Sequence, residues 1–295
     1  MGMGAGLAGR SAALAALYGE ADEIVGYELS RICLEGPAER LNATAVSQPG
    51  ILLTSAACLQ ALRSGLLEGE LAEVEPDACV GLSLGEYTAL YAAGALGLAE
   101  ALRLVQVRGE AMEEAAKLRA GGMVSVLGLG EERVAALCEA VLAERPVEED
   151  GEAAVLAPVN FNCPGQIVVS GTKGAVGLGA SRAIELVVAG GFHTELMRPA
   201  AERLGVALAG VEFAEPECPV YANVDVEAYG SAAEIPAKLM AQLTGAVRWQ
   251  QTVERLLGEG FERFVEIGPG RVLTGLVKKT ARERKARPEI VTING

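Results

Sequence analysis

The stretch Gly81-Leu82-Ser83-Leu84-Gly85 decides how this chain can fold. The short apolar segment at 77–80 precedes it and predicts a buried strand, and apolar spacing after it predicts a helix from Leu84 to about Ala93. Glycines around a serine, between a strand and a helix, allow the tight turn that exposes the serine hydroxyl. The Leu84 amide and the helix N-terminus could then stabilise an oxyanion. Without these flanking elements the pattern would be no more than a turn, so they carry the prediction of a nucleophile at Ser83.

On either side of this turn, the sequence changes between two kinds of hydrophobic pattern. Helical spacing on both sides of the turn predicts an α/β domain made of residues 1–117 and 189–295. Between them, residues 118–188 predict a strand, a helix and three further strands, so we expect a small inserted subdomain there. The expected helices lie at 11–18, from 49 onward, and at 98–117, 131–143 and 248–257, and the expected strands at 123–127, 155–161, 166–170, 183–188, 220–224 and 264–267.

Composition excludes several classes of protein. The net charge of -14 argues against general nucleic-acid binding, which needs a basic surface. We see no apolar run long enough to span a bilayer and no secretion signal, so we expect a cytoplasmic protein. The six cysteines are scattered, which predicts small buried hydrophobes in a reducing compartment. With one histidine and no cysteine cluster, we expect no structural zinc site and no metal.

A serine nucleophile needs a base, and His193 is the single histidine of the chain. If this is a serine–histidine enzyme, His193 must be that base. The alternative is a structural histidine with no catalytic role. The glycine-rich loop that carries it, Gly190-Gly191-Phe192-His193, precedes a predicted helix, and functional groups are commonly displayed on such loops.

Five segments together resemble one enzyme family, the malonyl-CoA:acyl carrier protein transacylases of bacterial fatty-acid synthesis. They occur in the order of that family and extend over nearly the whole chain. The segments are Gly81-Leu-Ser-Leu-Gly-Glu-Tyr87, Gln106-Val-Arg108-Gly-Glu-Ala-Met112, the stretch 158–171, Gly191-Phe-His-Thr-Glu-Leu-Met197 and the stretch 265–276.

The resemblance implies a two-step acyl transfer. Ser83 would attack the malonyl thioester of coenzyme A with His193 as base, and the phosphopantetheine thiol of acyl carrier protein would then take the malonyl group from the serine. Arg108 would hold the malonyl carboxylate. A guanidinium fork suits this role because it can donate two parallel hydrogen bonds to a planar carboxylate. Without the resemblance, we would interpret Arg108 as an ordinary helix-surface residue.

The resemblance implies further site residues, and no cofactor. Gln48 would line the site, and Asn162 would lie near the coenzyme A side. In this family main-chain carbonyls orient the histidine, so Gln242 would supply one of them and Asn223 would lie beside it. Phe192 would restrict the site to malonyl by excluding branched acyl groups, although one methyl group is worth only about 1–3 kcal/mol.

The implied fold is an α/β-hydrolase-like large domain with a parallel sheet and an inserted ferredoxin-like subdomain. Three departures stand out. Leu82 occupies a position that is usually histidine in the family. We expect the chain, which opens at Met1-Gly-Met-Gly, to lack an initial strand and a loop that supplies one oxyanion donor. The segment 174–180, with three glycines, is too short for the usual second helix of the subdomain, so we expect one helix to be missing.

Acyl carrier proteins are acidic, so an acidic transacylase needs a local basic surface to receive one. We therefore hypothesise docking through Lys278, Lys279 and Arg282 in the basic C-terminal stretch. The alternative is a solvated helix end that balances an acidic protein. The family is usually monomeric, and we expect a monomer.

Three other functions remain open at the level of sequence. A serine esterase shares the Gly-x-Ser-x-Gly pattern, but Arg108 and the absence of an obvious third acid argue against it. A catalytically impaired protein that binds carrier protein or coenzyme A would fit the expected missing loop. An acyltransferase acting in trans on a polyketide synthase would use the same chemistry in another pathway.

Overall fold

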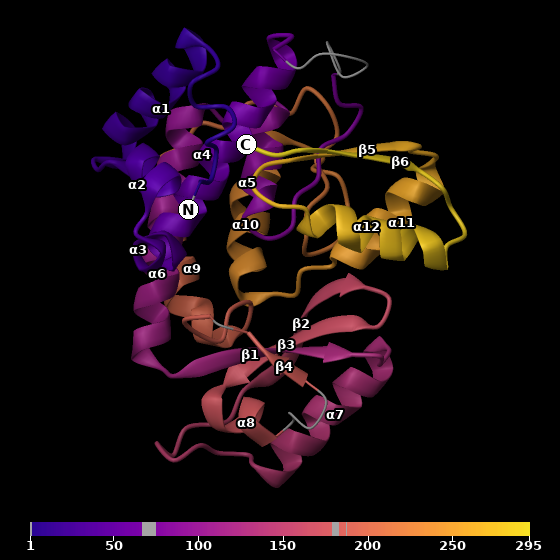
Figure 1. The fold of residues 1–295 in the computed structure, drawn as a ribbon. Helices are drawn as coiled ribbons and strands as arrows, with labels where there is room; N and C mark the ends of the chain where they lie inside the picture. Colours follow the sequence, from indigo (N-terminus) through magenta and orange to yellow (C-terminus); the bar gives the residue numbers. More distant parts are fainter. Residues whose placement is uncertain (1, 67–74, 179–182, 187) are drawn as a thin grey trace.

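A computed structural model describes residues 2–66, 75–178, 183–186 and 188–295, and shows an α/β protein (Figure 1). The helices are α1 (Ala12–Val25), α2 (Leu29–Glu35), α3 (Ala38–Asn42), α4 (Thr44–Arg63), α5 (Gly85–Ala92), α6 (Leu98–Leu118), α7 (Glu131–Glu144), α8 (Lys173–Leu178), α9 (Arg198–Leu208), α10 (Ile235–Thr244), α11 (Trp249–Glu259) and α12 (Val272–Glu283). The strands are β1 (Gly121–Leu127), β2 (Leu156–Cys163), β3 (Gln166–Thr172), β4 (Ala183–Glu185), β5 (Arg263–Ile267) and β6 (Glu289–Ile293).

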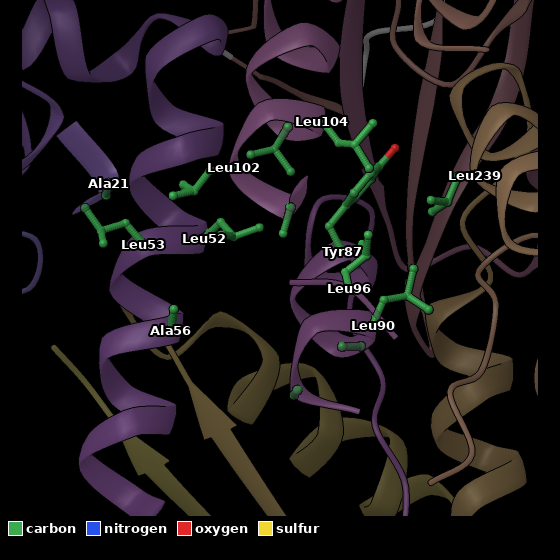
Figure 2. Close-up of a cluster of buried hydrophobic side chains, with 14 of the residues drawn as sticks. Ala21, Leu52, Leu53, Ala56, Tyr87, Leu90, Leu96, Leu102, Leu104 and Leu239 are labelled. Carbon is green, nitrogen blue, oxygen red and sulfur yellow. The ribbon is translucent and has the colours of Figure 1, made fainter. Parts of the chain in front are cut away.

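The main core lies between helices α4, α5 and α6. Leu52 from α4 faces Leu102 from α6, Leu53 lies beside Ala21 of α1, and these side chains are fully buried (Figure 2). Tyr87 and Leu90 extend the same cluster from α5, the helix that follows the Gly-Leu-Ser-Leu-Gly turn. The turn is thus anchored to the main core of the molecule.

Helices α4 and α6 cross closely because of a glycine. A Cβ on Gly109 of α6 would lie 2.7 Å from the carbonyl oxygen of Thr44 and 2.8 Å from the Cα of Ala45. At the same crossing, the amide of Ala45 donates a hydrogen bond to the carboxylate of Glu113 at 3.0 Å. This contact gives one of the unpaired N–H groups at the start of α4 a negatively charged acceptor.

Helix α4 corrects two sequence expectations. It is long and apolar enough, by length and composition, to cross a membrane, although we expected no such run. In this fold 72% of the apolar window is buried, so its side chains build the core. The helix also begins at Thr44, which places Pro49 inside it and not in its first turn. Likewise, α1 continues to Val25, beyond the expected helix at 11–18, and includes the acidic segment 19–23.

The four-stranded sheet has the order β2-β3-β1-β4 and is antiparallel throughout. Its register pairs Val124 with Val169 and Val126 with Ile167. These residues form a separate core with Val134 of α7. Figure 1 shows this sheet, with α7 and α8, apart from the larger helical layer.

We expected one of the two helices that cover this sheet to be missing. This expectation is wrong, because a short second helix is present. Helix α8 has six residues, contacts β1 and β3, and places Ala175 and Val176 in the sheet's core. Part of the segment 174–180 lies outside the described residues. The expected strand 183–188 is shorter than predicted, since β4 ends at Glu185.

The parallel sheet expected in the larger part of the fold is much reduced in the described residues. The predicted strands 77–80 and 220–224 meet at one parallel bridge, between Cys79 and Val220. Strands β5 and β6 form a separate parallel pair, with Phe264 opposite Ile290. The segment 77–80 is therefore an extended lead into the turn and not a strand with a full ladder of hydrogen bonds.

Candidate active site

The turn before α5 is strained in the way that an exposed nucleophile requires. Ser83 has a φ of 53°, a left-handed conformation that side-chain-bearing residues rarely adopt. A Cβ on Gly81 would lie 2.0 Å from the carbonyl carbon of Gly85, so only glycine fits there. Within the described part of the chain no hydrogen bond occupies the Leu84 amide, which lies next to the nucleophile.

His193 directly contacts Ser83. Its Nε2 lies 2.8 Å from Ser83 Oγ, and its Nδ1 lies 2.7 Å from the carbonyl oxygen of Gln242. A carbonyl can only accept, so Nδ1 carries the proton and Nε2 is free to accept from the serine hydroxyl. His193 itself has a φ of 62°, which shows that its loop, like the serine turn, is held in a rare conformation.

The His193 ring is neutral at physiological pH. Burial, followed by the nearby Arg108 charge, lowers the pKa of His193 to about 4. Hydrogen bonds to the carbonyls of Gln242 and Gly245 act in the opposite direction. A neutral imidazole whose Nε2 faces a serine hydroxyl can accept the proton that leaves during nucleophilic attack.

Arg108 brings a buried cation to the same hydroxyl. It is only 1% exposed, and its Nη2 donates to Ser83 Oγ at 2.9 Å and to Gln242 Oε1 at 3.0 Å. Its Nη1 donates to Gln48 Oε1 at 2.6 Å. The Nε group is buried and has no hydrogen-bond partner among the described residues. This burial shows that the interpretation as a helix-surface arginine is wrong.

Glu86, which was not among the residues predicted from the sequence, connects Asn223 and Gln242 in this site. It is fully buried and accepts hydrogen bonds from Gln242 Nε2 at 2.7 Å, from the Asn223 amide at 3.1 Å and from the Tyr229 hydroxyl. Burial raises the pKa of Glu86 to about 7, although these donors oppose the rise. Its presence in the quoted segment 81–87 was the available signal, because a carboxylate seldom stands inside an apolar helix without a partner.

The side chains of Asn223 and Gln242 bind the backbone of the serine turn. Asn223 Oδ1 accepts from the Ser83 amide at 2.6 Å, and its Nδ2 donates to the Gly81 carbonyl at 2.7 Å. Gln242 Nε2 donates to the Ser83 carbonyl at 2.9 Å. Gln242, for which we predicted a main-chain carbonyl near the histidine, and Asn223, predicted as a neighbour in the site, thus also bind the turn through their side chains.

The remaining candidates are placed less directly. Phe192 precedes the histidine and is buried in the main core, and Leu84 packs partly against that core. Leu82 packs against the cluster that contains Val247. Asn162 lies on β2, and within the described chain no hydrogen bond joins it to Ser83, His193 or Arg108.

A basic groove lies on the C-terminal helix. Its volume is about 430 Å³, and the cations that line it come from α12 and from the turn after it. These are Lys278, Arg282, Lys285 and Arg287. Lys279, predicted together with Lys278 and Arg282, lies instead beside the Cys163 thiol. Among the described residues, no group of three or more His, Cys, Asp or Glu side chains is placed to hold a metal ion.

Comparison with known proteins identifies the family. Residues 1–293 match the acyl transferase domain family. The malonyl CoA-acyl carrier protein transacylase of Bacillus subtilis is 41% identical over 293 residues, which cover 97% of this chain and 88% of that protein. The polyketide biosynthesis transacylase PksC of the same organism is 36% identical, with coverage of 97% and 95%.

Solved structures agree with these relatives. A malonyl-transacylase in complex with its type II polyketide acyl-carrier protein has a TM-score of 0.89 and 36% identity, and the match covers 100% of this chain and 92% of that chain. An acyl carrier protein S-malonyltransferase from Vibrio cholerae has a TM-score of 0.88 and 37% identity, with the same coverage. This chain belongs to the acyl transferase family, among the malonyl CoA-acyl carrier protein transacylases.

Proposed function

We propose that this protein transfers malonyl from malonyl-CoA to the phosphopantetheine thiol of acyl carrier protein, through a malonyl ester on Ser83. The observation that carries the proposal is that one hydroxyl meets both a neutral imidazole and a buried guanidinium, at 2.8 and 2.9 Å. The relatives named as malonyl CoA-acyl carrier protein transacylases support the same activity.

The first half of the reaction follows from the hydrogen bonds at Ser83. The hydroxyl passes its proton to His193 Nε2 as Oγ attacks the thioester carbonyl. The free Leu84 amide supplies a donor for the developing oxyanion. Collapse of the tetrahedral intermediate releases coenzyme A, whose sulfur takes the proton from His193, and leaves malonyl on Ser83. The carrier-protein thiol then repeats these steps in reverse order.

Arg108 gives the site its preference for a carboxylate-bearing acyl group. In the resting site its fork is directed to Gln48, Gln242 and Ser83, and its Nε is unpartnered within the described residues. A malonyl carboxylate would replace these neutral acceptors with charge-assisted hydrogen bonds. We assign Phe192 to acyl-group selection and Asn162 to the coenzyme A side of the site.

Both catalytic side chains come from one chain, which supports a monomeric enzyme, and serine–histidine chemistry of this kind needs no cofactor. All six cysteines are free thiols, in keeping with a reducing, cytoplasmic compartment. We assign carrier-protein docking to the surface around Lys278, Lys279 and Arg282. The groove beside Lys278 and Arg282 supports this assignment, since no acidic residue lines it.

We further propose that residues 1–117 and 189–295 form an α/β-hydrolase-like domain and that residues 118–188 form a ferredoxin-like subdomain. The antiparallel sheet with its own core and two covering helices supports the second part of this division. The serine turn leading into α5 supports the first part. The assembled Ser83–His193–Arg108 group does not favour a non-catalytic binding protein.

Intact-protein mass spectrometry after mixing with malonyl-CoA tests the function. We expect a mass gain of one malonyl group that Ser83→Ala abolishes and that acyl carrier protein discharges. No gain from folded protein, or discharge to water at the same rate without carrier protein, would refute the transacylase and favour, respectively, a binding protein or an esterase.

A further inference from the structure

Two cysteines meet next to the serine turn. The sulfurs of Cys79 and Cys218 lie 3.7 Å apart and share a hydrogen bond. Their backbones are neighbours, since the Cys79 amide donates to the Pro219 carbonyl at 2.8 Å and Cys79 pairs with Val220. Both cysteines are free thiols.

The two sulfurs are close enough for a modest movement to join them. An S–S bond is about 2.05 Å long, so the sulfurs need to approach by only about 1.7 Å. Hydrogen bonds from the Glu217 amide to the Ala93 carbonyl and from the Cys79 amide to the Pro219 carbonyl hold the backbone next to Cys218, so rotation of the two cysteine side chains must supply most of that movement. No other sulfur–sulfur contact occurs among the hydrogen bonds of the described residues.

The two thiols differ in accessibility and in ease of ionisation. Cys218 is partly exposed, and its pKa is lowered, chiefly by its hydrogen bond with the Cys79 thiol. The Arg63 guanidinium acts in the same direction, whereas burial and the carboxylates of Glu217 and Asp77 oppose the shift. Cys79 is buried, and its pKa is raised. Cys218 is thus the thiol that an oxidant meets first, and Cys79 lies within reach of the product.

We propose that peroxide oxidises Cys218 and Cys79 to an intramolecular disulfide, and that this bond reversibly stops acyl transfer at Ser83. In the first step, the Cys218 thiol and hydrogen peroxide give a sulfenic acid and one water. In the second, the Cys79 sulfur displaces hydroxide from that sulfenic acid, forming the disulfide and a second water. Two electrons pass from the thiols to one peroxide, and a dithiol reductant reverses the change.

The effect on activity, which rests on the proposed function, follows from what each cysteine adjoins. Cys79 stands four residues before Ser83, in the segment that leads into the serine turn. Cys218 stands five residues before Asn223, which binds the Ser83 amide and the Gly81 carbonyl. Drawing these two segments together shifts the turn against Asn223, and a misplacement of about 1 Å at a reacting group can cost about 100-fold in rate.

Mass spectrometry of the full chain treated with hydrogen peroxide tests the bond itself. We expect a loss of two hydrogens, and a non-reduced digest in which the peptides carrying Cys79 and Cys218 are joined. Cys218→Ser should show neither change, while Cys138→Ser, a control in the separate sheet core, should show both. A Cys218 that proceeds to sulfinic acid while Cys79 stays a thiol would overturn the proposal.

The rate of malonyl transfer tests the switch. Peroxide should lower it by about 10- to 100-fold in wild type, dithiothreitol should restore it, and Cys218→Ser should resist the loss. A disulfide-bonded protein with an undiminished rate would overturn the switch while leaving the proposed function intact. Reduced protein that transfers no malonyl would refute the proposed function, and the joined peptides would still decide whether the disulfide forms.

Discussion

Arg108 presents a positive charge to the nucleophile from inside the core, where it is 1% exposed and forks between Gln48, Gln242 and Ser83. Replacing it with lysine keeps the charge but loses the planar fork. We expect Arg108→Lys to lower kcat/KM for malonyl-CoA by about 100-fold, which corresponds to the loss of one or two charge-assisted hydrogen bonds. Steady-state kinetics with malonyl-CoA measure this change in kcat/KM.

Arg103→Lys provides the matched control, because Arg103 lies on the same helix and is exposed. It should leave kcat/KM within about twofold of wild type. Equal effects of the two substitutions would show that Arg108 does not bind the acyl group.

Glu86 is a positioning residue, since it reaches Ser83 and His193 only through Asn223 and Gln242. In Glu86→Gln the new amide nitrogen faces N–H donors unless it turns to Tyr229, so the network around the turn loosens. We expect kcat to fall about 10-fold while KM for malonyl-CoA changes little. An unchanged kcat, or a change confined to KM, would contradict this role. Glu20→Gln, at an exposed site, is the control.

The pKa of about 4 at His193 fixes the acid side of the pH–rate profile. A base must be unprotonated, so in Glu86→Gln, which removes the titration of Glu86 near pH 7, the rate of Ser83 acylation should stay level from neutral pH to about pH 5 and fall below that. Stopped-flow acylation across this range tests the expectation. A fall centred near pH 6.5, the ordinary histidine value, would show that burial does not control this group.

At the scale of elements, the crossing of α4 and α6 holds Gln48 against Arg108. Gly109→Ala would place a methyl group 2.7 Å from the Thr44 carbonyl oxygen, so the helices must separate. We expect about 1–3 kcal/mol of destabilisation, together with a loss of activity. Gly258→Ala in α11, where nothing lies within 4 Å, should instead stabilise the protein by about 0.5–1 kcal/mol. Denaturant unfolding measures the change in unfolding free energy for both variants. If both variants were stabilised, or both destabilised, this role of Gly109 would be refuted.

Elements with strong local signals were predicted well, as α6 and α7 show. Helix α6 was expected at 98–117 and runs Leu98–Leu118, and α7 was expected at 131–143 and runs Glu131–Glu144. Elements whose signal depends on their neighbours were not. The segment 77–80 has strand-like residues but pairs only at Cys79, and α8 forms because its apolar side chains are buried against β1 and β3.

For the whole molecule, Glu86 and His193 make opposite contributions to pH-dependent stability. The pKa of Glu86 is raised from 4.5 to about 7, so between these values the folded protein binds more protons and stability falls as pH rises. The pKa of His193 is lowered from 6.5 to about 4, so the unfolded chain binds more protons and stability rises with pH. Between pH 4.5 and 6.5 the two slopes offset each other.

Replacing one of the two residues should reveal the pH dependence of stability that the other residue contributes. From pH 4.5 to 6.5, the Tm of His193→Gln should decline relative to wild type, and that of Glu86→Gln should increase relative to wild type. Each slope is at most about 1.4 kcal/mol per pH unit. Thermal unfolding at several pH values measures the slopes, and parallel curves for all three proteins would contradict the opposed contributions.

The sequence alone was enough to predict a nucleophile, a base and the family, because these predictions depend on short segments and on a single histidine. Ser83, His193 and Arg108 could be named from the motifs that carry them. Only the tertiary structure decided that Arg108 is buried, that Glu86 joins Asn223 to Gln242 and that Cys79 meets Cys218. These pairs are separated by more than a hundred residues, and no local pattern encodes a contact that exists only when distant segments pack together.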